Sequence, residues 1–277
     1  MIEFLKAVLF GVVEGVTEWL PISSTGHMIL LNEFVKLDVT PEFWDMFLVV
    51  IQLGAIMAVV ALYWDRIFPF QFGGSSFLRM DVVSMWIKVV VGCLPAVVIG
   101  LPFDDLFEEL FYNYQTVAVA LIVFGIAFIV IENKNKERKP KVKSIAQLTL
   151  PAAFVIGIFQ LIAGIFPGTS RSGSTIVGAL LLGVSRTAAA EFTFFMAIPV
   201  MFGASLLKIV KFIAEGMAIS GMEWMILLTG CIVAFVVSML VIKFLMGYIR
   251  KHNFKVFGWY RIALGVIVLA YFMFAAA

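Results

Sequence analysis

Residues 11–27 read GVVEGVTEWLPISSTGH, and residues 157–175 read GIFQLIAGIFPGTSRSGST. Both stretches place polar residues inside strongly apolar sequence. A shift of 146 positions superimposes three pairs of residues: Gly11 on Gly157, Pro21 on Pro167 and Ser24 on Ser170. Polar groups at membrane depth are costly, so those that are present usually carry function. Two such blocks at matching places in two halves of the chain predict one composite site.

The composition excludes a soluble domain. Hydrophobic residues make up 62% of the chain, charged residues make up 14%, and the mean hydropathy is +1.07. Apolar runs of the roughly 17–25 residues that a helix needs to cross a bilayer recur along the whole chain. We therefore predict an all-α integral membrane protein that contacts membrane lipids. The net charge of +2 gives no reason to expect nucleic acid as a partner.

The hydropathy pattern predicts six transmembrane helices, three in each half: 43–64, 86–103, 114–131, 190–210, 223–245 and 259–275. Before each triplet lie two shorter apolar pieces, 2–20 with 22–35 and 145–166 with 171–183. Each pair is interrupted at Pro21 or Pro167, where a helix ends because proline lacks a backbone donor. Broken helices at membrane depth are tolerated where they are buried in protein or line an aqueous cavity. Each pair is therefore predicted to form a re-entrant helical hairpin.

Three crossings per half insert the second half upside down relative to the first, which is an inverted-topology repeat. The predicted division is a first repeat at 1–132, a basic linker at 133–144 and a second, inverted repeat at 145–277. The two cysteines, Cys93 and Cys231, follow glycines in apolar sequence and are predicted to be packing residues.

Loop charges predict the orientation. Twelve basic residues fall on one side of this topology: Arg66, Arg79, Lys134, Lys136, Arg138, Lys139, Lys141, Lys143, Arg186, Arg250, Lys251 and Lys255. The opposite side carries Lys36, Lys211 and a loop expected at 104–113 with the acids Asp104, Asp105, Glu108 and Glu109. The basic side is predicted to be cytoplasmic, so both termini and the opening of the first hairpin face outward.

Glu14 and Glu18 are four residues apart and share one face of a helix. Two carboxylates this close repel unless a cation lies between them or one of them keeps a proton. A divalent cation, Mg²⁺ or Ca²⁺, prefers oxygen ligands and commonly shares them with substrate phosphates. We predict that the pair binds metal or acts as a base, the alternatives being two solvated acids at a helix end or a neutralised structural pair.

Residues 167–175 have the composition of an oxyanion site. A helix that restarts after Pro167-Gly168 presents free N–H groups and the positive end of its dipole. Arg171 adds a planar fork suited to bidentate phosphate contact. Further candidate phosphate ligands in this block are Gly168, Thr169, Ser170, Ser172 and Thr175.

The first block offers Ser24 as a nucleophile, with His27 as its base or as the acid for the leaving group. Alternatively, Ser24 donates hydrogen bonds while a water molecule attacks. Ser23, Thr25 and Gly26 are further candidate phosphate ligands. Together the two hairpins predict a site for an anionic phosphate ester that is reached from within a membrane. Phe47, Phe194 and Phe195 could line a groove for its chain, but helix packing against lipid is the preferred interpretation.

These motifs resemble those of the undecaprenyl-diphosphate phosphatase family of the bacitracin-resistance type. The resemblance rests on Glu14 to Glu18 with Pro21 to His27, and on Pro167 to Thr175, and it extends over essentially the whole chain. It implies hydrolysis of undecaprenyl diphosphate to the monophosphate, which recycles the lipid carrier of cell-wall synthesis in the bacterial cell membrane. It also implies a divalent cation and a site that opens to the extracytoplasmic side.

A different class of function, a transporter or flippase for a polyprenyl phosphate, uses the same architecture. The Glu14/Glu18 pair beside Ser24 and His27 favours a hydrolase, because an anion carrier gains little from two more negative charges. Whether a homodimer forms, and whether serine or water attacks, is left open by the sequence.

Overall fold

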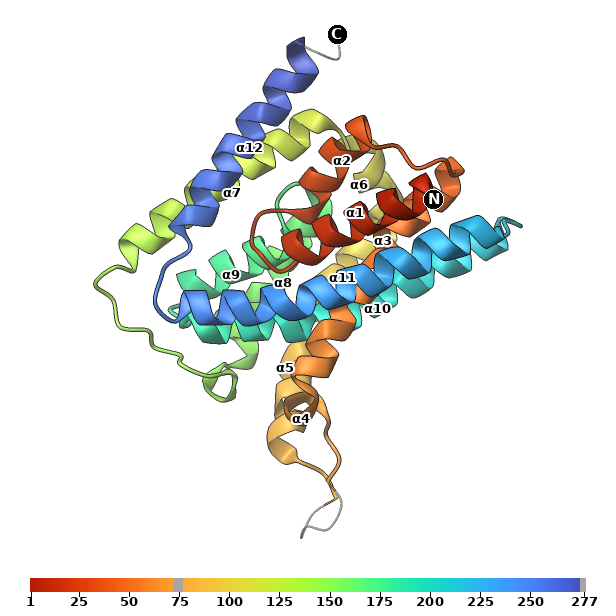
Figure 1. The fold of residues 1–277 in the computed structure, drawn as a ribbon. Coiled ribbons are helices and arrows are strands. Elements are labelled where there is room, and N and C mark those ends of the chain that lie inside the picture. Colours follow the sequence, from red (N-terminus) through yellow and green to blue (C-terminus); the bar gives the residue numbers. More distant parts are fainter. Residues whose placement is uncertain (72–76, 275–277) are drawn as a thin grey trace.

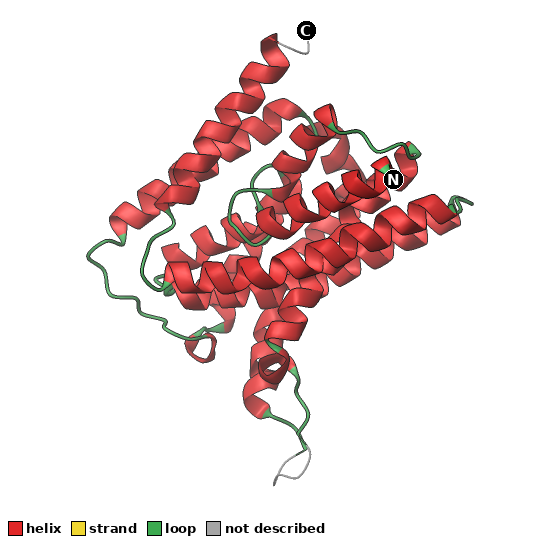
Figure 2. Cartoon of the chain, in the orientation of Figure 1, coloured by secondary structure: helices red, strands yellow, loops and turns green. Residues whose placement is uncertain are grey.

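The computed structural model describes residues 1–71 and 77–274, and within them all regular secondary structure is helical (Figure 2). The first half contains α1 Ile2–Thr17, α2 Ser24–Phe34, α3 Pro41–Leu62, α4 Trp64–Ile67, α5 Met80–Pro95, α6 Asp104–Phe111 and α7 Tyr114–Lys134. The second half contains α8 Leu150–Ile165, α9 Arg171–Leu181, α10 Arg186–Ala214, α11 Gly221–Ile249 and α12 Lys255–Phe274. The predicted all-α class is confirmed for the described residues.

Six helical segments among the described residues are long and apolar enough to cross a membrane: Pro41–Leu62, Met80–Phe111, Tyr114–Lys134, Arg186–Ala214, Gly221–Ile249 and Lys255–Phe274. Each overlaps one predicted span. The second is longer than predicted, because α5 continues through a π turn at Ala96–Gly100 and a 3₁₀ turn at Leu101–Phe103 into α6. The acidic residues expected in a loop at 104–113 therefore lie largely on a short helix, which corrects that prediction.

Helices from the two halves pack against each other in a reciprocal pattern. Helix α1 packs along α11 and α8 packs along α5, while α3 pairs with α10 and α7 with α12 (Figure 1). Glycines allow the backbones of α1 and α11, and those of α8 and α5, to approach closely. A Cβ atom on Gly11 would lie 2.7 Å from the carbonyl oxygen of Gly230, and one on Gly157 would lie 2.2 Å from that of Gly92.

Each of the pairs α1–α2 and α8–α9 is joined by a short turn that ends in a serine with a left-handed backbone. Ser23 has φ 74° and Ser170 has φ 68°, and each side chain accepts a hydrogen bond from the third residue of the helix that follows. The structural counterpart of Ser170 is therefore Ser23 rather than Ser24. The offset changes by one because the second turn contains an additional residue, Gly168, with φ 90°.

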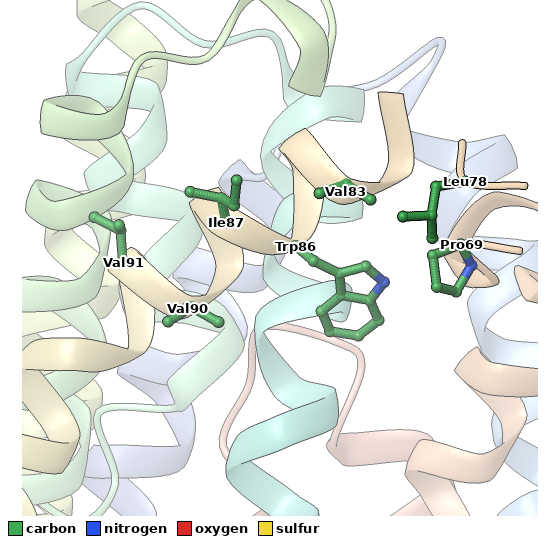
Figure 3. A pocket seen from close by; sticks show the side chains of 7 residues that line it. All are labelled: Pro69, Leu78, Val83, Trp86, Ile87, Val90 and Val91. Atoms are coloured by element: carbon green, nitrogen blue, oxygen red, sulfur yellow. The ribbon is translucent and has the colours of Figure 1, made fainter. Parts of the chain in front are cut away.

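Phe47, Phe194 and Phe195 are fully buried in the protein core, so they pack against other helices rather than against lipid, which corrects that prediction. Cys93 and Cys231 are free thiols. Figure 3 shows an apolar pocket of about 450 Å³ beside α5, where Trp86 and Val83 face Pro69. The indole nitrogen of Trp86 donates to the carbonyl of Ile67. Among the described residues, those that line this pocket include no charged side chain and none from the two polar turns.

Candidate active site

The carboxylate of Glu18 joins the two polar turns. Glu18 follows the last residue of α1, and its Oε2 accepts a hydrogen bond of 2.7 Å from the hydroxyl of Ser24 at the start of α2. Its Oε1 lies 2.7 Å from Nη2 of Arg171, the first residue of α9. The structure thus brings an acid, a hydroxyl and a guanidinium from distant parts of the sequence into direct contact, and the acid is only 7% exposed.

Glu14 lies one helical turn before Glu18 and is buried, with 1% of its surface exposed. Its Oε1 atom has no hydrogen-bond partner within the described part of the chain. A buried acceptor without a partner costs free energy, so it calls for an explanation such as an ion. No group of three or more His, Cys, Asp or Glu side chains that could hold a metal occurs among the described residues. Two carboxylates fit the way in which proteins bind Mg²⁺, with phosphate oxygens and water as the remaining ligands.

Most of the candidate phosphate-binding hydroxyls hold the turns together. Ser23 and Ser170 cap the following helices through Gly26 and Gly173. The hydroxyl of Ser172 lies 3.1 Å from the carbonyl oxygen of Glu18, to which it donates. These interactions use the polar atoms within the protein and fix the geometry of the site.

Thr175, the last residue of the second motif, also makes internal contacts. Its hydroxyl lies 2.9 Å from the carbonyl oxygen of Arg171 and 2.8 Å from the hydroxyl of Thr193 on α10. This contact holds the first turn of α9 against α10. The side chain is fully buried, and its hydroxyl is bonded within the protein.

Two threonines remain available to a ligand. Thr169 is buried, and its hydroxyl oxygen has no hydrogen-bond partner among the described residues. Thr25 is half-buried and lines a cavity of about 710 Å³. Gly168 contributes through its backbone alone, because a Cβ atom there would lie 2.4 Å from the carbonyl oxygen of Val117.

The 710 Å³ cavity is lined by residues of both polar blocks and of the acidic helix α6. Its lining includes Thr25, Gly164 and Pro167 near the turns. Gly164 corresponds to Glu18 under the shift of 146 positions, and a Cβ atom on it would meet nothing within 4 Å. Six charged residues share the remaining lining with apolar side chains: Asp45, Asp104, Asp105, Glu108, Lys208 and Lys211.

His27 does not contact Ser24. Its Nδ1 lies 2.7 Å from the carbonyl oxygen of Ser23 and must carry the proton, since a carbonyl only accepts. Its Nε2 lies 2.7 Å from the hydroxyl of Tyr260 on α12, and the two rings stack. The group that can accept the proton of Ser24 in this arrangement is Glu18, and His27 fixes the first turn against α12.

Arg261 on α12 is a functional residue that the sequence reasoning missed. It is fully buried, and its guanidinium donates to the carbonyl oxygens of Pro21 at 3.2 Å, Gly168 at 3.0 Å and Thr169 at 2.6 Å. It thereby ties both polar turns to α12 and, within the described chain, forms no ion pair with a carboxylate. An arginine inside the predicted span 259–275 was the available signal, because a charge at membrane depth is costly.

Comparison with known proteins agrees with this arrangement. Residues 7–267 match the family described as bacitracin resistance protein BacA. The chain is 65% identical to the undecaprenyl-diphosphatase of Desulfitobacterium hafniense, over 98% of this chain and 97% of that one. It is 62% identical to undecaprenyl-diphosphatase 1 of Clostridium acetobutylicum, over 98% of both chains, and 58% identical to the undecaprenyl-diphosphatase of Acetivibrio thermocellus, over 99% of both. This chain therefore belongs to the BacA family.

Proposed function

We propose that this protein hydrolyses undecaprenyl diphosphate to undecaprenyl phosphate and inorganic phosphate in the bacterial cell membrane. The observation that carries the proposal is the contact of Glu18 with both Ser24 and Arg171. This contact brings a hydroxyl, a carboxylate and a guanidinium together, which supports their use as nucleophile, proton acceptor and phosphate-binding fork. The names of the relatives supply the substrate.

The chemistry follows from these contacts. Arg171 and the N-termini of α2 and α9 bind the diphosphate oxygens, since helix N-termini and guanidinium groups both favour phosphate. The Ser24 hydroxyl passes its proton to Glu18 and attacks the terminal phosphorus, and the bond from that phosphorus to the bridging oxygen breaks. Undecaprenyl phosphate leaves, and water then releases phosphate from the serine. The alternative, direct attack by water while Ser24 donates a hydrogen bond, needs the same groups.

Ser24→Ala separates these two routes. We expect a fall in turnover of about 10²–10⁴-fold if the serine forms the covalent intermediate. Phosphate release from a prenyl diphosphate by the purified protein measures this. Ser205→Ala is the control, because Ser205 is a buried serine whose hydroxyl donates to the carbonyl of Val49 on a different helix. Turnover within a few-fold of wild type in Ser24→Ala would instead assign the attack to water.

Glu14 and Glu18 would hold a divalent cation, and we propose Mg²⁺ because only two carboxylates are present for it. A bound Mg²⁺ would neutralise charge on the diphosphate and polarise its P–O bonds. We expect a chelator to abolish phosphate release and added Mg²⁺ to restore it. Glu14→Gln should lower release strongly, whereas Glu191→Gln, at an ion pair with Arg66, should not. Release that is insensitive to chelator would remove the metal from the proposal.

An apolar groove of about 470 Å³ between α7 and α8 offers a place for the prenyl chain. Its wall includes Val119, Val123, Phe124 and Phe166, and it ends at Thr169 in the second polar turn. A lipid whose phosphates lie at that turn would place its chain in the groove. If the purified protein bound the lipid but released no phosphate, the rival function of a carrier would be favoured.

We further propose that the chain is an inverted repeat with two re-entrant hairpins and that its site opens outward. The reciprocal packing of α1 on α11 and α8 on α5 through matching glycines supports this symmetry. The division into 1–132, 133–144 and 145–277 remains a prediction, as does the orientation.

The orientation can be tested with a cysteine at Leu106, which is 47% exposed on α6. We expect an impermeant thiol reagent to label Leu106→Cys in intact cells. Lys139→Cys, in the basic linker, should be labelled only after permeabilisation. The unsubstituted protein, with its free Cys93 and Cys231, gives the background. The reverse pattern would show that the topology is inverted.

A further inference from the structure

A second polar pocket, of about 370 Å³, lies where three long helices end. The last turn of α7, the first residues of α10 and the end of α11 surround it, and the basic linker closes one side. The linker is held there by its backbone: the N–H of Lys141 donates to the carbonyl of Gly183, and the N–H of Ser185 donates to that of Val142, both at 2.8 Å. None of the residues that line this pocket belongs to the active site described above.

Unpaired positive charge surrounds the pocket. Four exposed cations line it: Arg138, Lys139, Lys141 and Arg250. None of the four forms an ion pair with a carboxylate in the described part of the chain. The acid among the lining residues, Glu132, is already used. It pairs with Arg186 and accepts a hydrogen bond from the backbone N–H of Phe254. The pocket therefore lacks an internal counterion for four cations.

The inner wall of the same pocket is apolar. Leu180, Leu181 and Leu182 from the end of α9 and Ile249 from α11 line it, and Leu181 is 53% exposed. Because the pocket lies at the ends of membrane-length helices, it lies at the depth of lipid headgroups. Cations at that depth beside leucines match a phospholipid, because its phosphate pairs with cations and its acyl chains pack against apolar side chains. Free inorganic phosphate would make no use of the leucine wall.

We propose that this pocket binds the headgroup of an anionic phospholipid, separately from the site of phosphate hydrolysis. Basic pockets between transmembrane helices are known to bind anionic headgroups, and each nearby cation contributes about fivefold in affinity. The phosphate contacts Arg138, Lys139 and Lys141, and the acyl chains lie along Leu181. This lipid seats the basic linker between the halves against the membrane.

The test uses full-length protein in a neutral detergent and fluorescent phosphatidylglycerol as the probe. We expect Arg138→Gln/Lys139→Gln/Lys141→Gln to weaken its binding by at least tenfold. The matched control is Lys134→Gln/Lys136→Gln/Lys143→Gln, which removes the same charge from the same linker outside the pocket and should change binding less than threefold. Leu181→Glu, on the apolar wall, should also weaken binding. Elution of each variant as a single species on gel filtration shows that it is folded.

Three results would overturn the proposal. Equal losses in the two triple variants would mean that the linker charge acts without a pocket. Equal binding of phosphatidylcholine by the wild type would mean that no anionic headgroup is selected. Displacement of the probe by inorganic phosphate at the same concentration would mean that the pocket binds phosphate rather than lipid. Phosphate release is not the readout, so failure of the proposed enzymatic activity would leave this test unaffected.

Discussion

Arg171→Lys is expected to lower turnover about 10²–10³-fold, the loss typical of removing one donor that stabilises charge in a transition state. Nη2 of Arg171 lies 2.7 Å from Oε1 of Glu18. Arg261, by contrast, donates its hydrogen bonds to backbone carbonyls of both polar turns. Lysine keeps the charge but replaces a planar fork with a point charge, so it cannot bind phosphate and Glu18 in the same geometry. Phosphate release under saturating substrate measures the effect.

Arg66→Lys is the matched control for this variant. Arg66 makes a bidentate contact with Glu191, at 2.7 and 3.0 Å, but half of its side chain is exposed. Exposed ion pairs contribute about 0–1 kcal/mol, so this variant should retain most of its activity. Near-normal turnover in Arg171→Lys would contradict the assignment of Arg171 to the phosphate. In that case, Glu18 alone would have to account for the polarity of the site.

Arg261→Met is expected to destabilise the protein strongly and to abolish phosphate release. Methionine is unbranched like the stem of arginine, but it is shorter and donates no hydrogen bond, which leaves the carbonyl oxygens of Pro21, Gly168 and Thr169 without this donor. Each buried acceptor left unsatisfied costs about 1–3 kcal/mol. The thermal midpoint of unfolding, followed by intrinsic fluorescence in detergent, should fall by several degrees.

Arg261→Lys distinguishes a role of Arg261 in positioning the polar turns from a role in stabilising the fold alone. A single ammonium group cannot reach acceptors in both turns, so we expect this variant to fold but to lose turnover while its midpoint falls less than that of Arg261→Met. Lys251→Met, at an exposed position outside both sites, is the control and should leave both quantities unchanged. A wild-type midpoint and turnover in Arg261→Met would show that the turns do not depend on this arginine.

The sequence alone determined the membrane class, the six spans and the places where helices break, because these follow from local hydropathy and from proline. It also determined which residue types meet in the site, since Glu18, Ser24 and Arg171 stand in polar blocks that apolar surroundings make conspicuous. Their pairing was a harder question. The expected partner of Ser24 was His27, three residues away, but the structure shows Glu18 in contact with Ser24 and Tyr260 in contact with His27.

Only the tertiary structure decided which polar groups hold the turns. Hydroxyl residues of this kind are typical of a phosphate site, yet four of them bond within the protein: Ser23, Ser170, Ser172 and Thr175. The hydroxyl of Thr169, by contrast, has no hydrogen-bond partner among the described residues. The role of Arg261 arises from contacts with turns about 90 and 240 residues earlier in the chain. Such contacts depend on how helices of the two halves pack, and no local spacing in the sequence records that packing.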